Sequence, residues 1–174
     1  SGNNLIGASI APSLTTGNHN QMIGINAGRG LSTGSDNILF GNSAGFSQDT
    51  ASRNINIGTA AGELNVEAGN VFIGYQAGKK NTTGKSNTFI GLQAGDANTS
   101  SSHNTFMGKE TGGANTTGNS NTFLGSEAGK SNTTANENTF IGRGAGLNSS
   151  AHYNTFVGAN SGQSNTSGTM NVFI

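Results

Sequence analysis

The residues of this chain that could take part in chemistry are few and scattered. Its three histidines, His19, His103 and His152, recur at no common spacing, so we expect solvated turn residues and no metal site. The eight acidic residues are equally dispersed. Glu110 and Glu127 are 17 residues apart, which is more typical of a polar face than of a glycosidase carboxylate pair. We therefore expect no catalysis, no cofactor and no metal ion.

Two polar patterns are more regular than these. One is Asn-x-Ser/Thr, the acceptor pattern for N-glycosylation, but a repeated turn also requires Asn before Thr, and we favour the turn. The other is a threonine series, and regular threonine arrays on flat β-solenoids can bind ice. The patterns begin at Asn81, Asn98, Asn115, Asn132, Asn148 and Asn165, and the threonines are Thr88, Thr105, Thr122, Thr139 and Thr155.

Composition excludes several classes of partner. Only 9% of the residues are charged, and eight acids balance eight bases, so we expect no attraction to nucleic acid or to an anionic membrane. No apolar run approaches the roughly 20 residues of a membrane span. The chain has no cysteine and therefore no disulfide. Because the sequence starts and stops in mid-pattern, we expect it to be a fragment of a longer protein.

An internal repeat dominates the sequence. The motif Asn-Thr-Phe-Ile-Gly recurs every 17 residues, with two steps of 16, and we number each repeat from its Asn as position 1. Position 4 is always apolar, position 5 is always Gly, and position 9 is Gly in nine repeats of ten. The position-1 residues are Asn3, Asn20, Asn37, Asn54, Asn70, Asn87, Asn104, Asn121, Asn138, Asn154 and Asn171.

This repeat predicts an all-β parallel β-solenoid of about ten coils, one 17-residue coil per repeat. Thr, Phe and Ile favour a strand at positions 2 to 4, and Gly and Asn favour the turns. We also expect a second short strand around the Ala-Gly pair. Like residues stack over like about 4.8 Å apart. The stacked asparagines are expected to form a turn ladder through Asn70, Asn87, Asn104, Asn121, Asn138 and Asn154.

Neighbouring strand residues point to opposite faces, so only one of the apolar positions 3 and 4 can fill the coil unless a bulge intervenes. We predict that position 4 faces inward, and that position 3 forms an outward stripe that is buried between chains. An inward position 2 would argue against ice binding. The predicted core is Ile57, Ile73, Ile90, Met107, Leu124, Ile141 and Val157, and the predicted oligomer interface is Phe72, Phe89, Phe106, Phe123, Phe140, Phe156 and Phe173.

The array reads as a single domain over 1–174, with less regular repeats in 1–69 and regular repeats in 70–174. Leu14 and Leu31 replace polar residues at position 12, and Asn56 interrupts the apolar position 3. We therefore expect the N-terminal end to pack differently, against a preceding domain of the longer protein.

The string Ser86–Gly91, followed by Ala94-Gly95, resembles the repeat of trimeric autotransporter adhesin heads and of bacterial and phage fibres. The resemblance covers the whole chain, but the adhesin repeat is shorter and lacks the bulky Phe. It implies a left-handed β-roll, three parallel chains, and an extracellular shaft or head on a cell surface or virion. The partners it implies are other copies of the chain and a host-cell or matrix ligand. An ice-binding or other regular-surface-binding solenoid is the alternative.

Overall fold

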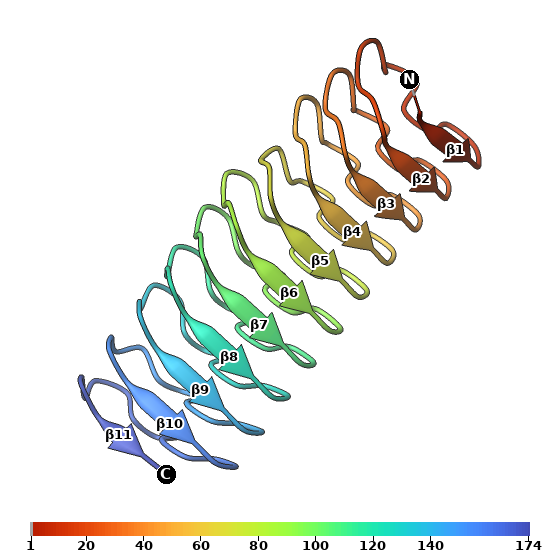
Figure 1. Ribbon diagram of the computed structural model, residues 1–174. Helices are drawn as coiled ribbons and strands as arrows, with labels where there is room; N and C mark the ends of the chain where they lie inside the picture. Colours follow the sequence, from red (N-terminus) through yellow and green to blue (C-terminus); the bar gives the residue numbers. More distant parts are fainter. Residues whose placement is uncertain (1) are drawn as a thin grey trace.

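The computed structural model describes residues 2–174, and these form a single stack of short parallel strands joined by turns (Figure 1). No helix occurs in this range, and hence none that could cross a membrane. The predicted parallel β-solenoid is confirmed. Its strands are β1 (Asn4–Ile6), β2 (Gln21–Ile23), β3 (Ile38–Phe40), β4 (Ile55–Ile57), β5 (Val71–Ile73), β6 (Thr88–Ile90), β7 (Thr105–Met107), β8 (Thr122–Leu124), β9 (Thr139–Ile141), β10 (Thr155–Val157) and β11 (Val172–Phe173).

Each strand pairs in parallel with the next strand of the sequence, in the order β1 to β11. The pairing joins identical repeat positions, for example Thr105 to Thr122 and Phe106 to Phe123. The two 16-residue repeats keep this register, since Ile55 still pairs with Val71. The missing residue therefore falls in the return turn, where the chain has room to shorten without shifting the sheet.

The predicted second strand around Ala-Gly is wrong, because this segment is a run of turns. Gln93 and Gly95 both adopt left-handed backbone angles, with φ of 53° and 57°. A chain with such angles cannot remain extended. The segment is nevertheless tied to the next coil, since the Gly95 N–H donates to the Thr111 carbonyl at 3.0 Å. Each coil thus has one strand and one hydrogen-bonded turn face.

The phenylalanines fill the inside of the coils, so the prediction that they form an outward interface is wrong. Successive rings from Phe72 to Phe173 stack with centroids 4.8–5.2 Å apart. The glycine at position 9 makes room for each ring, because a Cβ on Gly95 would lie 2.6 Å from Phe89. Fully buried in this way are Phe72, Phe89, Phe106, Phe123, Phe140 and Phe156, whereas Phe173 in β11 is 43% exposed.

The position-4 side chains point outward, so the predicted core is wrong as well. Residues on either side of an inward Phe must face away from the coil, because side chains alternate along a strand. Met107 is 45% exposed and Ile141 38%. The other members of the predicted core, which are half-buried, are Ile57, Ile73, Ile90, Leu124 and Val157.

The asparagine ladder at position 1 is confirmed along the whole stack. The Oδ1 of each Asn accepts a hydrogen bond from the backbone N–H of the next Asn at 2.8–3.0 Å. In Asn121 the Nδ2 group crosses its own coil and donates to the Ala135 carbonyl at 2.8 Å. The side chain therefore bonds two buried backbone groups, one on the next coil and one across its own coil.

Position 12 carries a second set of buried asparagines in the later coils. Asn81 donates to the carbonyl of Gly84 at 3.0 Å and to Asn65 Oδ1 at 2.6 Å. The turn interpretation of the Asn-x-Ser/Thr pattern accounts for the members that are fully buried, because amides such as that of Asn81 bond the turn itself. These residues are Asn81, Asn98, Asn115 and Asn132.

The core divides into two parts. Aliphatic side chains, including Met22, Leu31 and Leu39, form one cluster in the first coils, and the phenylalanines form the other from Phe72 onward. Gln48 and Asn56 lie between them, fully buried, and their side-chain amide atoms have no hydrogen-bond partner. The N-terminal coils do pack differently from the rest, as the sequence predicted.

Candidate functional site

The most regular surface of the molecule is the outer face of the sheet, which consists of the position-2 and position-4 side chains of β1 to β11 (Figure 1). Strands β3 to β6 share one burial pattern, with a buried central residue between two half-buried ones. The two half-buried columns are the outer face. This surface runs the length of the stack, about 48 Å at 4.8 Å per coil.

Threonine occupies one column of this face in the later coils, and apolar residues occupy the other. In β7, for example, Thr105 and Met107 point outward from the two sides of the buried Phe106. The threonine column, which we expected to face inward, is therefore available to solvent. It consists of Thr88, Thr105, Thr122, Thr139 and Thr155.

The outer face changes character in β3 to β5, where both columns are apolar, whereas β1 and β2 carry Asn4 and Gln21 at position 2. The outward pairs in β3 to β5 are Ile38 with Phe40, Ile55 with Ile57, and Val71 with Ile73. None of the eleven strands carries a charged residue. The outer face is thus an uncharged surface with a purely apolar section at β3 to β5 and a mixed Thr/apolar section at β6 to β10.

Stacking makes the outer face flat and rigid. Sheets of many strands normally twist, and flat ones are typically held by side-chain ladders such as the Asn and Phe columns seen here. Figure 1 shows the strands lying side by side in nearly the same direction. Thr, Ile and Val side chains are also stiff because they branch at Cβ. The face can therefore present side chains at a fixed period.

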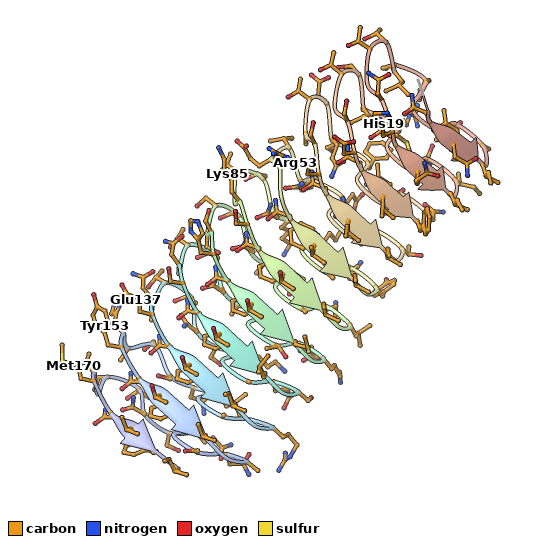
Figure 2. The ribbon with its side chains drawn as sticks, viewed as in Figure 1. His19, Arg53, Lys85, Glu137, Tyr153 and Met170 are labelled. Carbon is orange, nitrogen blue, oxygen red and sulfur yellow. The ribbon has the colours of Figure 1, made fainter. Side chains whose placement is uncertain are left out.

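Charged and variable side chains lie on the turns instead. Figure 2 shows a series of labelled side chains along the edge at which each coil returns to its strand. All of them are exposed, and they differ in charge and size from coil to coil, so this edge is chemically irregular. They are His19, Arg53, Lys85, Glu137, Tyr153 and Met170.

A small charged hollow lies on another turn, over Gly113. Position 10 is a residue other than Gly in all the remaining repeats, including Asp96 and Lys130 on the adjacent coils. Its absence at Gly113 leaves a hollow of about 360 Å³ that is lined by these side chains and by Gln93 and Glu110. The hollow holds both signs of charge, since Lys130 Nζ lies 2.6 Å from Glu110 Oε2.

The pKa values of the two carboxyl groups of this hollow are shifted in opposite directions. Burial raises the pKa of Asp96 above its ordinary value, with Lys80 acting against that shift. Hydrogen bonds from Lys130 and Lys109 lower the pKa of Glu110. Both carboxylates are nevertheless close to solvent, where ion pairs contribute little. The hollow reads as a local charge network on a turn.

The histidines are not brought together. His19 Nδ1 lies 3.3 Å from Asp36 Oδ1, and His152 Nδ1 accepts a hydrogen bond from the Asn136 N–H at 3.1 Å. His103 is exposed on a different coil. Within residues 2–174 there is no group of three or more His, Cys, Asp or Glu side chains that could hold a metal ion.

The repeat alone does not reveal the outer face, because positions 3 and 4 are both apolar and either could face the inside of the coil. The signal that could have placed it is the glycine at position 9. A column of glycines in register with a column of large rings is the arrangement expected when the rings pack against that segment from within the coil. The small Ala-Gly turn packs against the Phe at position 3 and not against position 4.

The chain matches no protein-family profile, no curated protein and no solved structure. What the structure shows is a parallel β-solenoid of about 17 residues per coil with stacked Asn and Phe ladders.

Proposed function

We propose that this chain is a structural or adhesive segment of an extracellular fibre, the shaft or head of a surface or virion appendage, with no catalytic role. The observation that carries the proposal is the unbroken stack. All eleven strands belong to one sheet in one register, and the Asn ladder runs from Asn3 to Asn171. A rod with this construction is long and stiff, and within residues 2–174 no coil leaves the common register to form a deep site.

The surface fits such a role. The phenylalanine column is closed within one chain as far as Phe156, so these coils need no partner to bury it, while Phe173 in the last strand is 43% exposed. The turn edge in Figure 2 varies from coil to coil and can present different side chains without disturbing the strands. Variable side chains on a rigid scaffold are the usual arrangement for binding surfaces.

The resemblance to trimeric adhesin heads supports an extracellular location and association with other copies. The specific contact expected for three chains, the Phe column, does not lie on the surface. Any contact between copies must therefore use other residues, and the outer face is the strongest candidate, because its position-4 column is apolar in every strand it reaches.

The test is to locate the native protein. Antibodies raised against residues 70–174 should label filaments on intact producing cells or particles, and external protease should remove the label. An antibody against an internal protein of the same source serves as the control for intactness. Label that appears only after permeabilisation would contradict an extracellular fibre.

A second candidate function is favoured by one observation, the outward threonine column of β6 to β10. Hydroxyl and methyl groups repeated about every 4.8 Å on a flat uncharged face could order water in a lattice, as ice binding requires. The purified chain would then show thermal hysteresis, and Thr122→Tyr would abolish it while Thr134→Tyr on an exposed turn would not. If the purified chain shows no thermal hysteresis at millimolar concentration, ice binding is excluded as its function.

A further inference from the structure

The outer face leaves one side of an all-parallel sheet uncovered. Parallel sheets are almost always covered on both faces. Here the inner face packs on the turn segments of the coil, whereas no segment of residues 2–174 covers the outer face, whose side chains are half-buried or exposed. The position-4 side chains on it are apolar from Ile6 to Ile174. Such a long apolar column on a soluble protein marks an interaction surface.

We propose that the outer face pairs with the outer face of a second copy of this chain, forming a side-by-side dimer whose two-fold axis runs parallel to the stack. In this arrangement each coil meets the same coil of the other copy. Rotation about such an axis reverses the strand direction, so the position-2 column of one copy lies opposite the position-4 column of the other.

The period of the face selects this partner. Side chains stay in contact at every coil only with a surface that has the same repeat of about 4.8 Å. A second copy has that repeat by construction, and side-by-side pairing keeps it in register from β1 to β11. The apolar sections at β3 to β5 then face each other, and the threonines of β6 to β10 face apolar side chains such as Met107 and Ile141.

Charge and area are consistent with pairing. No strand carries a charged residue, so no charge is desolvated when the faces meet. Eleven strands span about 48 Å, and a three-residue strand is about 10 Å wide, which gives about 500 Å² of projected surface on each copy. Two copies together then bury about 1,000 Å² or more, which reaches the lower limit for a specific interface.

A pair, and not a ring of three, follows from there being a single such face. One flat face that meets itself closes after two copies, whereas a three-fold ring needs two different contact surfaces or a wedge-shaped face. The inference deepens the proposed structural role and rests on it, because a face used to bind an ice lattice or another ligand would have to stay open.

The experiment is the solution mass of the wild-type chain by light scattering, from 1 to 200 µM. We expect a mass near twice the 17.5 kDa of one chain at the upper concentrations. The double variant Phe40→Lys/Ile73→Lys places two charges in the apolar section of the outer face. It should raise the apparent Kd at least tenfold, so that the monomer mass dominates.

The matched control is Thr50→Lys/Thr83→Lys, which adds the same charge to the same two coils on exposed turns. It should stay dimeric. A wild-type monomer at 200 µM, a trimer, or equal dissociation of both variants would overturn the proposed pairing. None of these outcomes affects the antibody labelling of intact cells, so the fibre proposal is tested separately.

A second measurement guards against misfolding of the charged variant. Because the chain has no cysteine, Ile55→Cys and Thr83→Cys each provide a single thiol. The rate of maleimide labelling at position 55 should fall at least fivefold as the protein concentration rises through the dimer range, and the rate at position 83 should stay constant. Labelling at both positions that is independent of concentration would contradict the pair.

Discussion

The coils before Asn70 and those after it have the same backbone but different interiors. The first group packs Met22, Leu31 and Leu39, and the second packs a column of stacked phenylalanines. Their outer faces differ as well, although this change falls one strand after Asn70, because β3 to β5 are apolar and β6 to β10 carry threonine. The coil geometry is thus set by the shared Asn and Gly positions, and the filling of the core can change without altering it.

The boundary between the two groups is the weak point of this design. Gln48 and Asn56 are fully buried there without hydrogen-bond partners, and a Cβ on Gly45 would lie 3.0 Å from the side chains of both. Elsewhere the buried asparagines are bonded to backbone groups. The same residue type therefore stabilises one region and weakens the other, which leads to four predictions.

The largest effect is expected from breaking the Asn ladder in the phenylalanine region. Asn121→Leu leaves the Asn138 N–H and the Asn138 Nδ2 group without their acceptor, and it removes one of the two donors to the Ala135 carbonyl. Each unpaired buried group costs about 1–3 kcal/mol, so we expect the free energy of unfolding to fall by about 3 kcal/mol. The measurement is chemical denaturation. An unchanged free energy of unfolding would contradict a stabilising role for the Asn ladder.

The same substitution at the boundary should have the opposite sign. Asn56→Leu removes two unpaired amide atoms and gives Leu39 and Phe72 an apolar neighbour in the position-3 column. We expect the free energy of unfolding to rise by about 1–3 kcal/mol, and Gln48→Leu to act in the same direction. Destabilisation by both variants would mean that the amides have partners that stabilise the boundary.

Hydrogen exchange should distinguish the two regions without any substitution. Unpaired buried groups lower the free energy needed to open the coils around them, so this boundary should open locally before the phenylalanine stack. Backbone amides in 37–69 should exchange at least about tenfold faster than those in 87–137, which corresponds to about 1.4 kcal/mol. Equal protection of the backbone amides in both ranges would show that the boundary and the phenylalanine stack open together.

The smallest effects are expected at the hollow over Gly113. Glu110 has a lowered pKa and so adds stability above its ordinary value of 4.5, which is lost as the pH falls through the folded-state pKa. Asp96 has a raised pKa, so its ionised form costs stability at neutral pH. Glu110→Gln should therefore destabilise at pH 7 and Asp96→Asn should stabilise, each by less than about 1 kcal/mol.

Both differences should shrink as the pH falls and vanish once the wild-type carboxyl groups are protonated in the folded and unfolded states. The measurement is the denaturation midpoint of each variant against wild type as a function of pH. Equal signs at pH 7 would contradict the opposed environments of the two carboxyl groups.

The sequence was sufficient to predict the repeat architecture, because invariant Asn and Gly columns leave few ways to stack 17-residue units. It also predicted the Asn ladder and the distinct N-terminal end. It was not sufficient to orient the strand, because positions 3 and 4 are both apolar and a three-residue strand has no longer alternation to show which is inside. Only the space above Gly95 and its equivalents decides between them.

Whether position 3 or position 4 faces the inside of the coil determines which surface the molecule offers to partners. With Phe106 outward, the chain needs partners to bury it, and with Phe106 inward the coil is closed and the surface on offer is Thr105 with Met107. The charged hollow could not be predicted from spacing, because it depends on a single missing side chain at Gly113 between residues of neighbouring coils.

The most direct test of the account is single-cysteine labelling across β7. Thr105→Cys, Phe106→Cys and Met107→Cys each introduce the only thiol of the chain. The account predicts that position 106 reacts only after denaturation at every protein concentration, whereas positions 105 and 107 react in the folded chain and faster on dilution. Rapid labelling at 106 with protection at 105 and 107 would contradict the inward phenylalanine column, and with it the outer face.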